Sequence, residues 1–327
     1  MVPKKKLMEQ AMAILQEKGR KSVELARQMV LQEPIEYELF KEALNYFMKD
    51  WSDVIHPALV ALACEAVNGK TDKTTQTGAA LVLLAGGADV HDDIIDQSVI
   101  KGSKPTVFGK FGNDIAILVG DALLLKGTYL LHQTSESLVK GRKDAVLKAV
   151  KQAFFEVSSA EARASSLRGK IDYSAQDYLK IIRHKAAVSE ASTRIGAIIG
   201  NGTREEIEIL GHFGRTYAIL STIRDEFVDM FEKDEIRNRR DKECLPLPII
   251  IAFQDHSRKM EILKLLEDPI DEDKIEVILD LSMDFKETRK LVQKMRRMAE
   301  EEGLHLLPIK HLKKTFELLL MSNIEDL

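Results

Sequence analysis

The chain has 327 residues and a formal net charge of -4, so it lacks the excess of basic side chains that is typical of nucleic-acid-binding proteins. Its two cysteines, Cys64 and Cys244, are too few for a disulfide framework and lack metal-ligand spacing, so we expect buried free thiols. No signal peptide is evident and no uncharged run reaches about 18 residues; we therefore expect a soluble cytoplasmic protein without a transmembrane segment.

Apolar residues recur with helical periodicity through nearly the whole chain, and proline is scarce. The segment 101–105 is predicted to be a loop because Gly102 and Pro105 punctuate it. No linker rich in Gly, Ser or Pro divides the chain, so we expect one domain over residues 1–327, an all-α bundle with inward-facing ligands. In chain order the pattern predicts helices over residues 4–32, 53–68, 74–97, 112–134, 143–167, 175–200, 204–232 and 246–266, with further helices after them.

Two segments carry three carboxylates each at the spacing i, i+1, i+4: Asp92, Asp93 and Asp96 in the first, and Asp225, Glu226 and Asp229 in the second. We call them the first and second acidic clusters. On a helix the first and last members of each cluster share one face, where like charges repel unless a cation neutralises them. Mg²⁺ prefers oxygen ligands and often bridges carboxylates to substrate phosphates. The two clusters therefore predict a Mg²⁺–diphosphate site between two helices.

A single acidic pair of this kind is more often a solvated helix face, but the sequence around both clusters argues against that interpretation. The first cluster is followed by residues 101–106 (KGSKPT) and 120–124 (GDALL), and the second by residues 245–249 (LPLPI). In this setting the clusters resemble the two aspartate-rich regions of the trans-isoprenyl diphosphate synthases, the polyprenyl synthetase family. Residues 57–69 and 178–187 match the family as well, so the resemblance extends over approximately residues 40–255.

The resemblance implies a class I isoprenoid synthase that binds an allylic prenyl diphosphate. Mg²⁺ held by all six clustered carboxylates would neutralise the leaving pyrophosphate while an allylic cation forms. The catalytic residues implied are Asp92, Asp93, Asp96, Asp225 and Lys185, and the diphosphate contacts implied are Lys101, Lys185, Arg224 and Arg239. Arg239 belongs to a charged segment, 232–243, which is either a cationic lid or a solvated loop. The resemblance also implies a homodimer.

Several positions depart from the family pattern where its members hold isopentenyl diphosphate. These members carry Gly-Gly-Lys-Arg-x-Arg-Pro up to the position of Pro57, and here Asp53 takes the lysine position and His56 that of the last arginine. A family histidine is replaced by Ala85, and the second arginine after the first cluster by Gly102. Asp53 would repel a diphosphate. We therefore expect an intact allylic site and a dismantled isopentenyl diphosphate site.

In this family the residues four and five positions before the first motif aspartate face the substrate tunnel. These are Ala88 and Gly87, and neither blocks the tunnel, which suits a prenyl chain of roughly C20 or more. The alternative is that Gly86, Gly87 and Ala88 simply permit close helix packing.

Three functions remain open at this point. The first hypothesis is an enzyme that ionises a long allylic diphosphate and transfers the cation to an acceptor other than isopentenyl diphosphate, or cyclises it as a terpene synthase does. The second is an ordinary chain-elongating prenyltransferase. The third is a non-catalytic regulatory subunit, which the first acidic cluster disfavours because such a subunit needs no metal ligands there.

Overall fold

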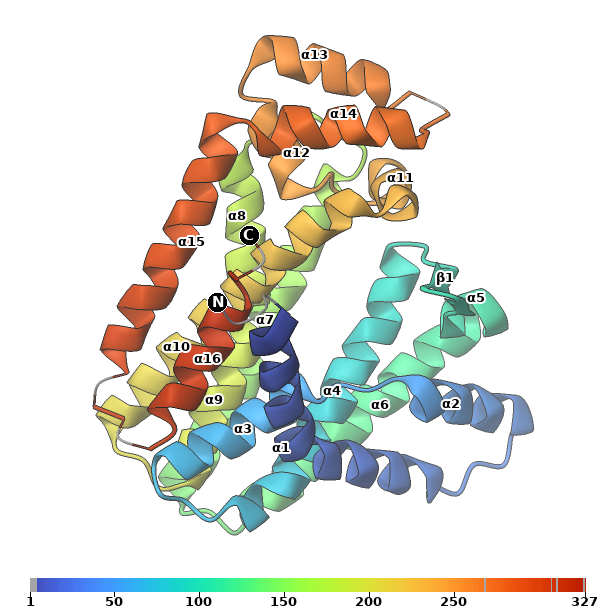
Figure 1. The fold of residues 1–327 in the computed structure, drawn as a ribbon. Helices are drawn as coiled ribbons and strands as arrows, with labels where there is room; N and C mark the ends of the chain where they lie inside the picture. Colours follow the sequence, from blue (N-terminus) through green and yellow to red (C-terminus); the bar gives the residue numbers. More distant parts are fainter. Residues whose placement is uncertain (1–4, 268, 307, 310, 326) are drawn as a thin grey trace.

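Helices form nearly all of the regular structure, which confirms the expected all-α fold (Figure 1). The computed structural model describes residues 5–267, 269–306, 308–309, 311–325 and 327. The first half of the chain forms α1 (Lys5–Leu31), α2 (Glu38–Asp50), α3 (Ile55–Ala66), the 3₁₀ turn η1 (Thr71–Lys73), α4 (Thr74–Ile95), the strands β1 (Ile100–Lys101) and β2 (Lys104–Pro105), α5 (Val107–Phe111), α6 (Asn113–Ser135) and α7 (Lys140–Leu167).

The second half continues the bundle and adds helices at one end of it (Figure 1). It forms α8 (Ala175–Lys185), α9 (Ala187–Ile199), α10 (Arg204–Val228), the 3₁₀ turn η2 (Asp229–Phe231), α11 (Lys233–Lys242), α12 (Leu247–Ala252), α13 (His256–Leu265), α14 (Glu272–Met283), α15 (Lys286–His305) and α16 (Lys313–Ser322).

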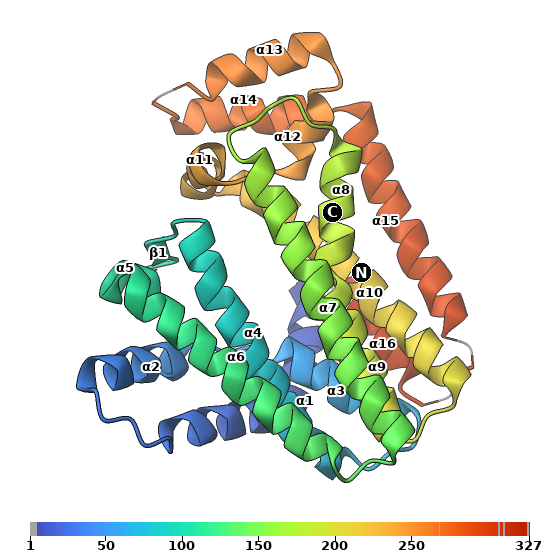
Figure 2. The ribbon, with the colours of Figure 1, turned by 180° about the vertical axis from the view of Figure 1, so that it is seen from behind.

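The centre of the bundle is formed by α3 and α9, which pack closely against each other and against α1, α4, α7 and α10 (Figure 2). Leu59 and Leu62 of α3 are fully buried, and each such side chain stabilises the fold by about 1.5–3 kcal/mol relative to exposure. A Cβ on Gly196 of α9 would lie 2.2 Å from the carbonyl oxygen of Val60. The two central helices can therefore approach this closely only with glycine at position 196.

Both acidic clusters stand at helix ends rather than within helices. Asp96 directly follows the last residue of α4 and donates its backbone N–H to the carbonyl of Asp92, while Asp229 follows the last residue of α10 and opens η2. Figures 1 and 2 show that these two helix ends lie at the same end of the bundle, beside α11 and the β1–β2 hairpin. The fold thus brings together two motifs that are far apart in sequence.

The structure departs from the predicted helices in four places. The predicted helix 175–200 is divided at Ala186, and the predicted helix 246–266 is divided before Asp255, whose side chain accepts the N–H of Arg258 and caps α13. The charged segment 232–243 contains the helix α11 where a loop was expected. The sequence analysis also missed α2, although its buried residues recur with helical spacing: Ala43, Leu44, Phe47 and Met48.

Among the described residues, one helix is long and apolar enough to cross a membrane by length and composition alone. This is α6, and 39% of its most apolar window is buried inside the protein, where α6 packs along α4. Core helices pass the same test, so the match is weak evidence, and the expected absence of a transmembrane segment stays a prediction.

The packing of α4 on α6 at Gly87 leads to a test of stability. A Cβ on Gly87 would lie 2.7 Å from Cγ of Leu124 and 2.8 Å from the carbonyl oxygen of Gly120. Gly87→Ala should therefore lower the free energy of unfolding by about 1–3 kcal/mol through overpacking, measured by urea denaturation. A Cβ on Gly141 of α7 would meet no atom within 4 Å. Gly141→Ala should therefore leave the free energy of unfolding unchanged or raise it by up to about 1 kcal/mol. Equal effects of the two substitutions would contradict this account.

Candidate active site

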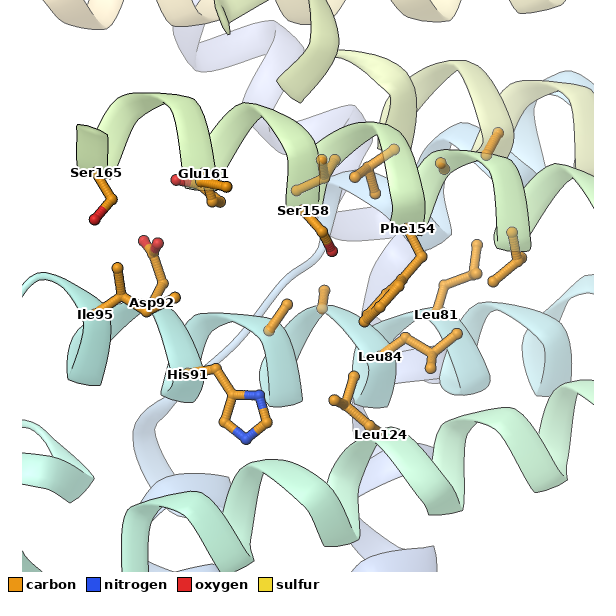
Figure 3. A pocket seen from close by; sticks show the side chains of 18 residues that line it. Leu81, Leu84, His91, Asp92, Ile95, Leu124, Phe154, Ser158, Glu161 and Ser165 are labelled. Atoms are coloured by element: carbon orange, nitrogen blue, oxygen red, sulfur yellow. The ribbon is translucent and has the colours of Figure 1, made fainter. Parts of the chain in front are cut away.

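An apolar cavity of about 420 Å³ lies between α4 and α7, with further walls from α6 and α9 (Figure 3). Asp92 stands at one end of the cavity, and Leu81 and Phe154 lie toward the other end (Figure 3). Ala88 lines the cavity as the sequence analysis expected. Gly87 does not line it, because this position faces α6, so the assignment of Gly87 to the tunnel is corrected. A volume of this size suits one elongated apolar ligand.

A smaller pocket of about 70 Å³ adjoins the apolar cavity and is rich in charged groups. The two spaces share Glu161 and Ser165 of α7. The charged residues that line the small pocket come from the first acidic cluster, α7, α8, the second acidic cluster and the segment after α11: Asp96, Glu161, Arg168, Lys185, Glu226 and Glu243. We call it the polar pocket. Together the two spaces match a ligand with an apolar chain and a charged head.

The surroundings of the first acidic cluster disfavour the negative charges of its carboxylates. Burial raises the pKa of Asp92 to about 7, and the nearby carboxylates of Glu161 and Asp96 add to this effect. Oδ1 of Asp92 is buried and has no hydrogen-bond partner among the described residues. Burial also raises the pKa of Asp93 to about 6, although the ammonium of Lys101 lies 3.0 Å away and opposes the shift. A cation beside Asp92 would remove this penalty.

Two lysines expected at the diphosphate lie in different surroundings. Nζ of Lys185 lies 2.8 Å from a carboxylate oxygen of Glu161 and lines the polar pocket, as a diphosphate contact would. Nζ of Lys101 lies 2.8 Å from Asp89 and 3.0 Å from Asp93, and it lines a separate pocket of about 140 Å³ beside α2. For Lys101, contact with a diphosphate in the polar pocket therefore requires a rearrangement, and its role stays a prediction.

The second acidic cluster is divided between an exposed and a buried part. Asp225 exposes 63% of its side chain and lies 3.6 Å from a guanidinium nitrogen of Arg224. Glu226 is buried, and its carboxylate accepts hydrogen bonds from the hydroxyl of Tyr178 (2.8 Å), the N–H of Leu247 (2.8 Å) and the guanidinium of Arg239 (2.9 Å). These contacts occupy Glu226, so its predicted role as a metal ligand has to be revised in this arrangement.

Arg239 does not line the polar pocket, although the sequence analysis placed it at the diphosphate. Only 4% of the residue is exposed, and besides Glu226 its guanidinium donates to a carboxylate oxygen of Asp229 at 2.6 Å and to the carbonyl oxygen of Cys244 at 2.9 Å. Residues 232–243, for which a cationic lid and a solvated loop were the two alternatives, contain the helix α11, whose Arg239 is anchored inside the protein. The physical reason is that the buried carboxylate of Glu226 and the partly buried carboxylate of Asp229 attract the nearest cation of their own chain.

The donor set of the first cluster fits a divalent cation, but the ligands do not stand ready. In the part of the chain that the structure describes, no three side chains of the His, Cys, Asp and Glu types are arranged to hold a metal ion. Arg168 lies 2.8 Å from Asp96, and Lys101 holds Asp93. Asp92 keeps a buried oxygen without a partner. If Mg²⁺ binds at the first cluster, Asp92 and Asp96 would hold it, with Asp96 released from Arg168, and a contribution from Asp225 stays a prediction.

The positions that depart from the family pattern have local structural roles. Oδ1 of Asp53 accepts the backbone N–H groups of Ile55 and His56 at the start of α3, and Oδ2 lies 2.6 Å from Nδ1 of His56. Burial opposes protonation of His56, but the carboxylate of Asp53 outweighs it and raises the pKa of His56. The repulsion expected from Asp53 is thus offset by its partner. Gly102 has φ +62° in the turn of the β1–β2 hairpin, which favours glycine there.

Two residues of the site were missed by the sequence analysis. Glu161 lies in both the cavity and the polar pocket, and Tyr178 donates its hydroxyl to Glu226. Ser158, Glu161 and Ser165 recur at helical spacing on the apolar stripe of α7 that contains Phe154, and this interruption of the stripe was the available signal. Tyr178 lies within a segment that matched the family, but a tyrosine at a helix surface carries no signal of a buried carboxylate partner.

The raised pKa of Asp92 predicts greater stability of the metal-free protein at mildly acidic pH. The pKa is about 7 in the folded chain and about 3.9 in an unfolded one, so the folded state binds the proton more tightly between these values. The free energy of unfolding should therefore rise as pH falls from about 7 to 4, by about 1–2 kcal/mol after allowance for solvent screening.

Thermal denaturation in EDTA between pH 8 and pH 5 measures this effect. Asp92→Asn should remove that part of the pH dependence, whereas Asp121→Asn, at an exposed carboxylate of α6, should retain it. The same pH dependence in wild type and Asp92→Asn would show that Asp92 does not titrate in this range.

Comparisons with known proteins agree with this geometry. The family model described as "Polyprenyl synthetase" matches residues 37–282. A short chain isoprenyl diphosphate synthase of Methanothermobacter thermautotrophicus is 27% identical over 80% of this chain and 78% of its own length. A geranylgeranyl diphosphate synthase of Sulfolobus acidocaldarius is 28% identical over 69% of this chain and 66% of its own length.

Solved structures show the same fold. The geranylgeranyl pyrophosphate synthetase from Pyrococcus horikoshii superimposes with a TM-score of 0.85 at 24% identity, over 97% of this chain and 98% of that structure. The geranylgeranyl pyrophosphate synthetase from Geoglobus acetivorans gives a TM-score of 0.80 at 20% identity, over 94% and 99% of the two chains. Because the family model spans most of the sequence and both acidic clusters, this chain belongs to the polyprenyl synthetase family, the trans-isoprenyl diphosphate synthases.

Proposed function

We propose that this protein is a Mg²⁺-dependent prenyltransferase that elongates an allylic prenyl diphosphate with isopentenyl diphosphate to a product of about C20. The observation that carries the proposal is the apolar cavity of about 420 Å³ that meets the polar pocket at Glu161 and Ser165. Such a pair of spaces accommodates a prenyl chain and its diphosphate at once. The names of the relatives, short chain isoprenyl and geranylgeranyl diphosphate synthases, support chain elongation.

Each part of the site has a role in this reaction. When bound, Mg²⁺ supplies the positive charge that stabilises the leaving pyrophosphate. Asp92, Asp96 and Asp225 hold the metal, and Lys185 donates hydrogen bonds to the diphosphate from the wall of the polar pocket. The apolar walls around Ala88 exclude water from the allylic cation and align the chain with its reacting carbon near Asp92.

A second candidate is transfer of the allylic cation to an acceptor other than isopentenyl diphosphate. It is favoured by one observation: Asp53 and His56 form a partly buried ion pair at the positions where the family pattern has lysine and arginine. Cyclisation or elimination, as in a terpene synthase, draws no support from the relatives. A regulatory subunit is disfavoured, because the buried acids around Asp92 cost stability without serving such a role.

We further propose a homodimer that forms through α6 and α7. The support is a set of large apolar side chains that these helices expose, with exposed fractions from 52% to 72%: Leu118, Leu125, Tyr129 and Phe155. Covering such a surface with a second copy stabilises it by removing apolar area from water.

The buried core draws side chains from α1 through α16, which supports one domain over residues 1–327. The cytoplasmic location stays a prediction.

The proposal predicts that purified protein with Mg²⁺ converts a C15 allylic diphosphate and isopentenyl diphosphate into a C20 diphosphate, detected by mass spectrometry. Asp92→Asn should reduce turnover by at least about 100-fold because it weakens the Mg²⁺ site, and Lys185→Gln should do so because it removes a cation that stabilises the leaving group. Asp121→Asn, at an exposed carboxylate of α6, should retain activity. EDTA should abolish the reaction.

Two results would contradict the proposal in different ways. Full activity in EDTA would exclude the metal role. Consumption of the allylic diphosphate that requires another acceptor, with no elongation by isopentenyl diphosphate, would favour the second candidate.

The cavity predicts opposite effects of two substitutions on chain length. Ala88→Phe should shorten the longest product, because the added ring fills the cavity near Asp92. Phe154→Ala should lengthen it, because Phe154 lies toward the far end of the cavity (Figure 3). Product lengths are measured by mass spectrometry with C10 and C15 substrates. An unchanged product profile in both variants would show that this cavity does not hold the prenyl chain.

A further inference from the structure

A buried arginine of α11, Arg239, contacts the second acidic cluster. Neither substrate binding nor the folding of α11 alone accounts for these contacts. Arg239 is 4% exposed, and its guanidinium bridges Glu226 and Asp229 with nitrogen–oxygen distances of 2.9 Å and 2.6 Å. It also donates to the hydroxyl oxygen of Tyr178 at 2.7 Å and to the carbonyl oxygen of Cys244 at 2.9 Å. One cation thus contacts two of the three carboxylates that the sequence assigned to metal.

The oxygen atoms of Glu226 have no room for a further ligand in this arrangement. Oε1 accepts from Tyr178 and Arg239, and Oε2 accepts from Arg239 and the N–H of Leu247. A carboxylate that is 6% exposed and has two donors on each oxygen is fully satisfied. A metal ion could reach Glu226 only by displacing the guanidinium.

Helix α11 is attached on its other side as well, so Arg239 is not the tip of a mobile segment. The guanidinium of Arg237 donates to the carbonyl oxygen of Ile270 at 3.1 Å, and that of Arg240 donates to the carbonyl oxygen of Leu266 at 2.7 Å. These bonds tie α11 to the chain after α13. Releasing Arg239 would therefore require α11 to move against bonds on both sides.

We propose that Arg239 is a fixed cation that takes the place of a divalent metal at Glu226 and Asp229. In this arrangement Glu226 is a structural partner of Arg239, and the second cluster presents Asp225 to the metal. Arg239 is thus a positioning residue that sets how many metal ions the site binds. A planar guanidinium suits this role because it reaches two carboxylates at once.

The inference rests on the metal dependence in the proposed function, but its test does not use turnover. The number of Mn²⁺ ions bound per chain is measured by electron paramagnetic resonance titration in the presence of pyrophosphate. Arg239→Gln should bind one more Mn²⁺ than wild type, because Glu226 and Asp229 lose their cation. Arg240→Gln, on the same helix, should bind the wild-type number.

Thermal denaturation provides a second measurement. In EDTA, Arg239→Gln should melt about 5–10 °C below wild type because the buried Glu226 and the partly buried Asp229 lose the cation that they share. Added Mg²⁺ should recover most of this difference in Arg239→Gln and raise the melting temperature of wild type by less. The double variant Arg239→Gln with Glu226→Gln lacks one charge of each sign, so it should melt above Arg239→Gln in EDTA and bind the wild-type number of Mn²⁺.

The outcomes are distinguishable. Equal Mn²⁺ binding and equal gains from Mg²⁺ in wild type and Arg239→Gln would overturn the inference and leave the proposed function intact. Absence of Mn²⁺ from both would overturn the inference together with the metal dependence. If Arg239→Gln does not fold, the inference is tested by comparing Arg239→Lys with the folded double variant. Arg239→Lys should bind more Mn²⁺ than the double variant, because a lysine ammonium contacts one carboxylate and leaves the other free.

Discussion

The arrangement of this site depends on one constraint: several carboxylates are partly withdrawn from water at the same end of a helical bundle, and their negative charges need partners. The constraint arises because α4 and α10 end at the same end of the bundle, each with an acidic cluster at its last turn (Figures 1 and 2). Burial raises the pKa of Asp92 to about 7, which measures how poorly the free charge is accommodated. A site with this property attracts cations, whether they come from solvent, from a substrate complex or from the chain itself.

The negative charges of the two acidic clusters are balanced in different ways. At the second cluster Arg239 is fully buried between Glu226 and Asp229, so the chain supplies the cation. At the first cluster the cations of the chain are more exposed: Lys101 exposes 57% of its side chain, and Asp92 keeps an oxygen without a partner. Partly exposed ion pairs are weak and exchange readily, whereas buried ones are costly to break. The proposed metal site would therefore centre on the first cluster, with the second cluster contributing mainly through its exposed end.

Features that depend on residue spacing along one helix could be predicted from the sequence. Features that depend on which element packs against that helix could not. The spacing of the two clusters and the helices that carry them follow from local periodicity, whereas the tunnel assignment of Ala88 came from the family resemblance. Gly87 lies against α6, which packs on that side of α4, whereas Ala88 lines the cavity, and this distinction depends on the neighbouring helix. Arg239 reaches Glu226 only because α11 folds back after η2, and no pattern in residues 232–243 predicts that return.

The pair of Asp53 and His56 shows why the second substrate is the open question in this chain. The pair is partly buried, caps the first turn of α3 and carries no net charge when His56 is protonated. Burial and the nearby carboxylates of Asp225 and Asp53 raise the pKa of Tyr217, which places a neutral hydroxyl in the environment of both acids. A diphosphate bound against this wall meets no fixed positive charge from α3. In the proposed reaction, cations from outside α3 would have to balance the charge of isopentenyl diphosphate. Lys101 and Lys104 line the pocket of about 140 Å³ beside α2 and are candidates for that role, whereas an uncharged acceptor would need no such cations.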